Sequence, residues 1–95
     1  MIAGKVVLGR GYVLTIWAPK EDNTLWNFDL KLNGVPQGNL NLRDVGQDNE
    51  PVSEESLNDS LKVWLCDKIS TSGVVEKSSN IVKNKLAKLV NKYRL

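Results

Sequence analysis

Residues 25–43 read LWNFDLKLNGVPQGNLNLR. From Trp26 to Leu32 every second residue is apolar, which is the period-two pattern of a β-strand with one buried and one hydrated face. The same alternation continues around Leu40 and Leu42. Asn33-Gly34 is a strong turn signal between the two runs, and residues 35–38 predict a connection longer than a two-residue hairpin. The segment therefore predicts two adjacent antiparallel strands.

More strand sequence precedes this segment. Tyr12–Trp17 is a run of β-branched and aromatic residues, and Val6–Leu8 could add a fourth strand. The glycines of Gly9-Arg10-Gly11 suggest a bulge or a close backbone approach between these two runs. If Tyr12 shares the core face with Trp26, then Trp17 falls on the opposite face of the sheet.

The period changes after Pro51, from two residues to about 3.6. Ser53 is a plausible N-cap for a helix, and Ser72-Gly73 resembles a stop before a second helix. Each predicted helix carries one apolar stripe. The stripes are Leu57, Leu61, Trp64, Leu65 and Ile69 in the first helix, and Val82, Leu86, Leu89, Val90 and Tyr93 in the second. Lys68 interrupts the first stripe, unless its ammonium group reaches the rim.

The predicted order is β-β-β(-β)-α-α within one domain spanning residues 1–95, with strands within 5–45 and helices within 53–94. Strands followed by helices predict an α+β fold: an antiparallel three- or four-stranded meander with two helices packed on one face. The predicted core consists of Trp26, Phe28, Leu30, Leu32, Leu61, Trp64, Leu86 and Leu89.

The composition argues against several classes of site. The 95 residues include no histidine and one cysteine. Catalytic triads with an imidazole base, zinc sites of Cys and His, and disulfides within the chain are thereby excluded. We find no nucleotide-binding motif and expect no catalytic residue, cofactor, metal or small-molecule ligand. No apolar run is long enough to span a membrane, and a single cysteine fits the cytoplasm.

Two local features have simple structural interpretations. Asp44, Asp48 and Glu50 share one loop and could offer oxygen ligands to a hard cation, but their spacing does not fit a calcium loop, so we expect solvated carboxylates. Cys66 has no neighbour that would activate a thiol, so we expect it to be partly buried and inert.

Charge is unevenly distributed although the net charge is only +2. Residues 61–95 contain eight basic and two acidic side chains, while residues 48–60 contain five acidic and no basic ones. Lys85, Lys88 and Lys92 fall on one flank of the second helix. This flank could bind phosphate, but antiparallel packing of the helices would let the acidic segment 48–59 neutralise it, and we favour neutralisation.

Trp17, Lys31 and Arg43 fall on the polar face of the predicted sheet. Trp17 could stack a nucleobase, anchor a protein partner or subunit, or fold over the sheet edge. The sequence therefore predicts a non-catalytic interaction or regulatory protein that binds another protein or itself, as a homo-oligomer. The alternative is a nucleic-acid-binding accessory protein that uses this face or the basic helix, with weak affinity because the cations are few.

Overall fold

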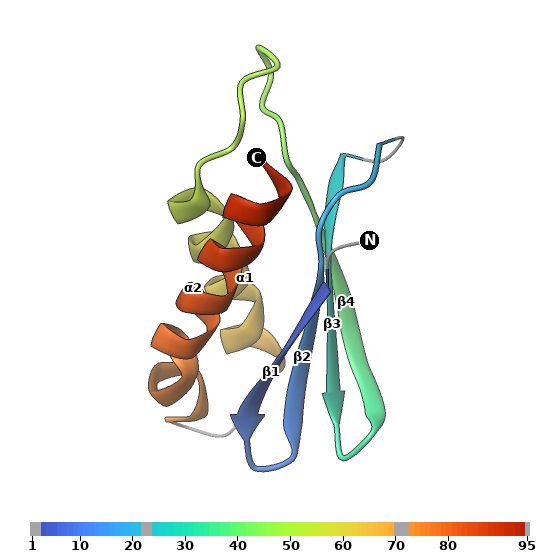
Figure 1. Cartoon of the computed structure of the whole chain (residues 1–95). Coiled ribbons are helices and arrows are strands. Elements are labelled where there is room, and N and C mark those ends of the chain that lie inside the picture. The colour runs from blue at the N-terminus through green and yellow to red at the C-terminus, as the bar shows by residue number, and fades with distance from the viewer. Residues whose placement is uncertain (1–2, 22–23, 70–72, 95) are drawn as a thin grey trace.

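The computed structural model describes residues 3–21, 24–69 and 73–94 as a sheet layer covered on one side by a helical layer (Figure 1). The elements in chain order are β1 Ala3–Gly9, β2 Tyr12–Trp17, β3 Leu25–Leu32, β4 Val35–Arg43, α1 Glu54–Lys68 and α2 Val74–Tyr93. The sheet is an antiparallel meander of order β1-β2-β3-β4. The predicted α+β fold is confirmed, with the fourth strand present.

The register places apolar side chains on the face beneath the helices. Leu14 is paired with Leu30, and Ile16 with Phe28, which pairs in turn with Leu40. Residues at paired positions share a face, so the period-two pattern becomes one continuous apolar surface. The largest fully buried side chains are Trp26, Phe28, Leu14, Ile16, Leu30, Leu57, Leu61 and Leu86.

Two members of the predicted core are only partly buried. Leu32 is the last residue of β3, directly before the turn, and Trp64 lies on α1 against the edge strand β4. Both positions are at the margin of the helical layer, where a side chain keeps one hydrated side. The spacing of apolar residues in the sequence identified the face on which both side chains lie, but not their distance from the centre of the core.

The predicted long connection after Asn33-Gly34 is wrong. The turn contains these two residues alone, with φ values of 50° and 83°, and β4 begins at Val35. Positive φ at both central positions is characteristic of the type I′ hairpin turn, which Asn-Gly favours. Pro36 is accommodated because β4 is an edge strand, and the register shift after Leu30 absorbs the irregular backbone near Gly38.

The connection from β1 to β2 is also a tight turn. Arg10 and Gly11 form it, with φ values of 52° and 87°. The register shifts between Val7 and Gly9, so the expected bulge lies at the end of β1.

Each edge strand carries one glycine beneath a helix. A Cβ at Gly4 in β1 would meet Lys85 Cε at 2.6 Å, and one at Gly38 in β4 would meet Lys68 Cε at 3.2 Å. The aliphatic stems of two lysines therefore cross the edge strands where no side chain projects. Lys68 as a whole is exposed, which explains how the apolar stripe of α1 tolerates it.

The helices run antiparallel, with the end of α2 beside the start of α1 (Figure 1). Ser53 is the N-cap of α1, as predicted, since its Oγ accepts from the Ser56 N–H at 3.0 Å. The predicted stop was partly wrong, because Gly73 is the N-cap of α2, with φ of 86°, and Ser72 lies outside the described residues. In the described part of the chain, no helix is long and apolar enough to cross a membrane.

Candidate functional site

The face of the sheet opposite the helices carries no covering element among the described residues (Figure 1). The registers place side chains from all four strands on it. We call this surface the open face; it consists of Ala3, Lys5, Val7, Val13, Thr15, Trp17, Leu25, Asn27, Asp29, Lys31, Asn39, Asn41 and Arg43. The face combines amides, hydroxyl, charge and apolar surface, as binding surfaces commonly do.

The open face is hollowed at one end by a depression of about 410 Å³. Its lining comes from β2, β3, β4 and the segment after β2, and consists of Trp17, Ala18, Lys20, Leu25, Asn27, Asp29 and Asn39. The volume falls within the range of small ligand pockets, which is roughly 300–1,000 Å³, but the depression is open to solvent. A projecting side chain of a partner would fit such a hollow.

Polar groups in the depression are held in a defined arrangement. Asn39 Nδ2 donates to Asn27 Oδ1 at 2.7 Å across the β3–β4 pair. This bond leaves the amino group of Asn27 and the carbonyl oxygen of Asn39 without another hydrogen bond to the described residues. One donor and one acceptor are therefore available side by side, a pair that can match a peptide group or a side-chain amide.

The three predicted sheet residues all lie on the open face but do not form one cluster. Trp17 ends the inner strand β2, pairs with Ala3 and Asn27, and lines the depression, so it does not fold over the sheet edge. Arg43 lies at the same end, paired with Leu25. Lys31 is four residues along β3 from Asn27, roughly 13 Å away at the rise of an antiparallel strand, and stands outside the depression.

The predicted lysines of the last helix belong to the other layer. Lys85 lies over Gly4 of β1, and Lys88 and Lys92 are exposed on α2. The expected neutralisation of these lysines by the acidic segment 48–59 does not occur through contact ion pairs in the described residues. Within residues 3–21, 24–69 and 73–94 one ion pair forms, between Arg94 and Asp44, and it leaves these three lysines unpaired.

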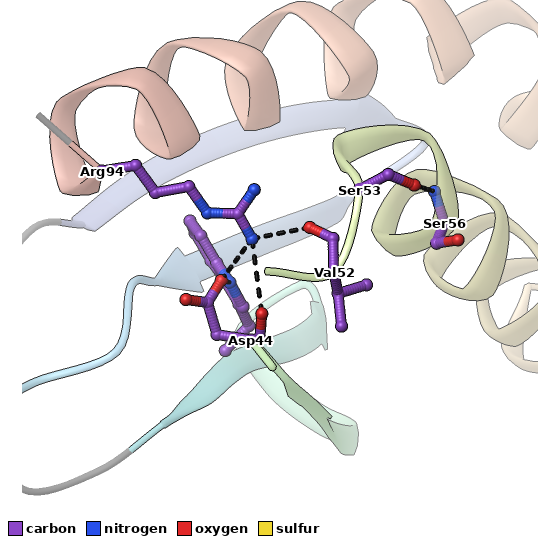
Figure 2. A network of polar contacts seen from close by, with 6 residues as sticks. Asp44, Val52, Ser53, Ser56 and Arg94 are labelled. Atoms are coloured by element: carbon purple, nitrogen blue, oxygen red, sulfur yellow. Dashed lines mark hydrogen bonds and ion pairs between the residues drawn. The ribbon is translucent and has the colours of Figure 1, made fainter. Parts of the chain in front are cut away.

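Asp44 is not a solvated carboxylate, contrary to the prediction for its loop. It is 6% exposed, and its Oδ1 accepts from Trp26 Nε1 at 2.8 Å and from Arg94 Nη2 at 2.6 Å. Arg94 Nη2 also donates to the Val52 carbonyl at 2.6 Å (Figure 2). In the described ranges, no three acidic or cysteine side chains gather at a position suited to a metal ion. The network joins the end of α2 to the sheet and to the loop before α1.

Cys66 is exposed, so the expectation that it is partly buried was wrong. It follows the buried Leu65 by one residue, which is about 100° around the helix and off the apolar stripe.

Of the residues that line the depression, sequence reasoning singled out Trp17 alone as a site residue. The alternation places Asn27, Asp29 and Asn39 on the polar face, but only the register of the strands brings them next to Trp17. No comparable signal identifies Lys20, because it lies in the irregular connection after β2. Comparisons with models of protein families, with curated proteins and with solved structures find no match for this chain.

Proposed function

We propose that the protein is a small non-catalytic interaction protein that regulates a partner protein by binding it through the open face. The observation that carries the proposal is the uncovered four-stranded face with Trp17 beside a depression of about 410 Å³. Tryptophan is enriched among the residues that contribute most to binding energy at protein interfaces. A cytoplasmic location accords with Cys66, a free thiol.

The charge of the open face favours a partner other than a second copy. Lys5, Lys31 and Arg43 supply three positive charges, and Asp29 supplies the single negative charge. Two such faces pressed together would bring like charges into a desolvated interface, which costs binding energy. The same charges attract a partner whose docking surface is acidic.

Apolar groups on the same face support a protein partner. Val7 is 71% exposed and its neighbour Val13 is half-buried on the adjacent strand. Together with Trp17 they offer apolar contact area at both ends of the face. Burial of this area would supply binding energy that does not depend on charge.

Nucleic acid remains the second candidate because the face is basic and includes Trp17. The structure offers it little support. Trp17 is the one aromatic side chain on the open face as defined above, whereas single-strand platforms stack successive bases on several aromatics. Asp29 lies in the depression and would repel phosphate. With three cations on the face, the salt dependence of binding would be shallow.

Replacing Trp17 with alanine tests the proposal. We expect Trp17→Ala to reduce the amount of a specific partner that co-purifies with tagged protein from the source cells by at least tenfold, since a tryptophan that acts as a binding hot spot contributes about 2 kcal/mol or more. The matched control is Val63→Ala, which removes an exposed apolar side chain from α1 on the far side of the molecule. Quantitative mass spectrometry of isotope-labelled samples measures how much partner co-purifies with each variant relative to wild type.

Circular dichroism and thermal melting confirm that each variant is folded, and Arg43→Glu provides a second open-face variant whose side chain is exposed. Equal recovery of the partner with wild type and both open-face variants would contradict the proposal.

A titration with single- and double-stranded oligonucleotides at about 150 mM salt tests the nucleic-acid alternative. Submicromolar binding that Trp17→Ala abolishes would replace the protein partner with nucleic acid.

A further inference from the structure

The two edges of the sheet differ in how they are protected. β4 includes Pro36, which has no N–H to donate, and an irregular register near Gly38. β1 has no proline, and its register is regular over residues 3–7, before the bulge at its end. No strand among the described residues pairs with the outer side of β1. Proline and bulges are devices that block strand addition, so the regular part of β1, residues 3–7, is the edge at which another strand can bind.

Positive charge borders β1 on both faces of the sheet. Lys5 projects on the open face, paired with Thr15. On the helical face the Lys85 stem lies over Gly4, as described above. Lys88 and Lys92 follow Lys85 by three and seven residues, so they continue the same flank of α2.

This positive charge favours an acidic strand over a second copy of the chain as the partner of β1. If two copies paired through β1, their α2 helices would lie next to each other, because α2 packs on β1. Lys85, Lys88 and Lys92 of both copies would then repel. A lysine in an edge strand likewise prevents pairing between copies. Both effects turn into attraction for a strand that carries carboxylates.

We propose that β1 binds an extended segment of the partner protein as a fifth strand, and that this segment carries two consecutive acidic residues. Consecutive residues of a strand project to opposite faces. An acidic residue opposite Gly4 reaches Lys85 on the helical face, and the next one, opposite Lys5, reaches its ammonium group on the open face. Backbone hydrogen bonds supply the affinity, and the carboxylates supply the choice of segment.

The proposal rests on the proposed function, because the added strand would extend the open face beyond Lys5 and Val7. One partner would thus bind the face with its surface and the edge with its acidic segment. The two parts depend on different residues, so they can be tested separately.

The probe is an acetylated and amidated peptide of about ten residues, with two central glutamates flanked by alternating threonine and valine. We expect titration of the ¹⁵N-labelled full chain to shift the backbone amides of Lys5 and Val7, and to leave those of β4 in place. Two control peptides, one with lysines for the glutamates and one with a central proline, should bind at least tenfold more weakly.

Charge reversal locates the contacts. The double variant Lys5→Glu/Lys85→Glu should weaken the glutamate peptide at least tenfold and bind the lysine peptide instead, whereas Lys83→Glu, an exposed lysine on the other flank of α2, should leave the affinity unchanged. Absence of binding at millimolar peptide, equal affinity for all peptides, or amide shifts confined to β4 would overturn the proposal. Loss of peptide binding with Trp17-dependent partner binding intact would reject the edge site alone; the reverse would reject the open face alone.

Discussion

Replacing Asp44 with alanine is expected to lower the free energy of unfolding by about 2–4 kcal/mol, because it leaves two buried or half-buried donors without their acceptor. Trp26 Nε1 is fully buried and loses its hydrogen bond, and Arg94 loses its carboxylate. The guanidinium retains the Val52 carbonyl and some contact with water, which keeps the loss below that of a fully buried pair. Urea denaturation followed by tryptophan fluorescence measures it.

Asp48→Ala is the matched control, since Asp48 is an exposed carboxylate in the same loop. Its effect should stay within about 0.5 kcal/mol, as is usual for surface positions. An Asp44→Ala variant no less stable than Asp48→Ala would show that the network does not hold the C-terminal end of α2 to the sheet.

Leu30→Ala is expected to cost about 2–5 kcal/mol of the free energy of unfolding, the range for deleting a buried leucine side chain from a packed core. Leu30 is 0% exposed, and the helices cover its face of β3. For a domain whose total stability is about 5–15 kcal/mol, the variant is expected to unfold at a clearly lower urea concentration.

Leu32→Ala provides the comparison within the same strand. Leu32 lies on the same face two residues later, but it is only partly buried beside the turn. Its loss should be clearly smaller than that of Leu30, since less apolar surface returns to water. Equal losses at the two positions, or a loss at Leu30 below about 0.5 kcal/mol, would contradict the assigned face and the covering helices.

Alternation in the sequence was sufficient to predict the sheet, because one face of each strand is buried and the period-two pattern records that burial. The turn length was mispredicted for a physical reason. Pro36 argues against a central strand, and only the tertiary arrangement shows that β4 is an edge strand where proline is tolerated. The bonds of Asp44 were equally unpredictable, since Arg94 lies 50 residues away.

The candidate site was predictable in part. The pattern placed Trp17 on the polar face, and the register confirms that position. Which polar residues surround Trp17 depends on how β3 and β4 are aligned, and that alignment followed from the turn. The position of Lys85 beside β1 required the packing of α2 over Gly4, a contact between residues that no local pattern connects.

Site-specific photocrosslinking tests most directly whether the open face is the protein-binding surface. A photoreactive amino acid replaces Val13 on the open face or, as the control, Ile81 on the outer surface of α2, where it is 54% exposed. After irradiation in the source cells, we expect a discrete crosslinked protein from position 13 that Trp17→Ala removes, and none from position 81. The same crosslinks from both positions, or crosslinking only to nucleic acid, would contradict the account.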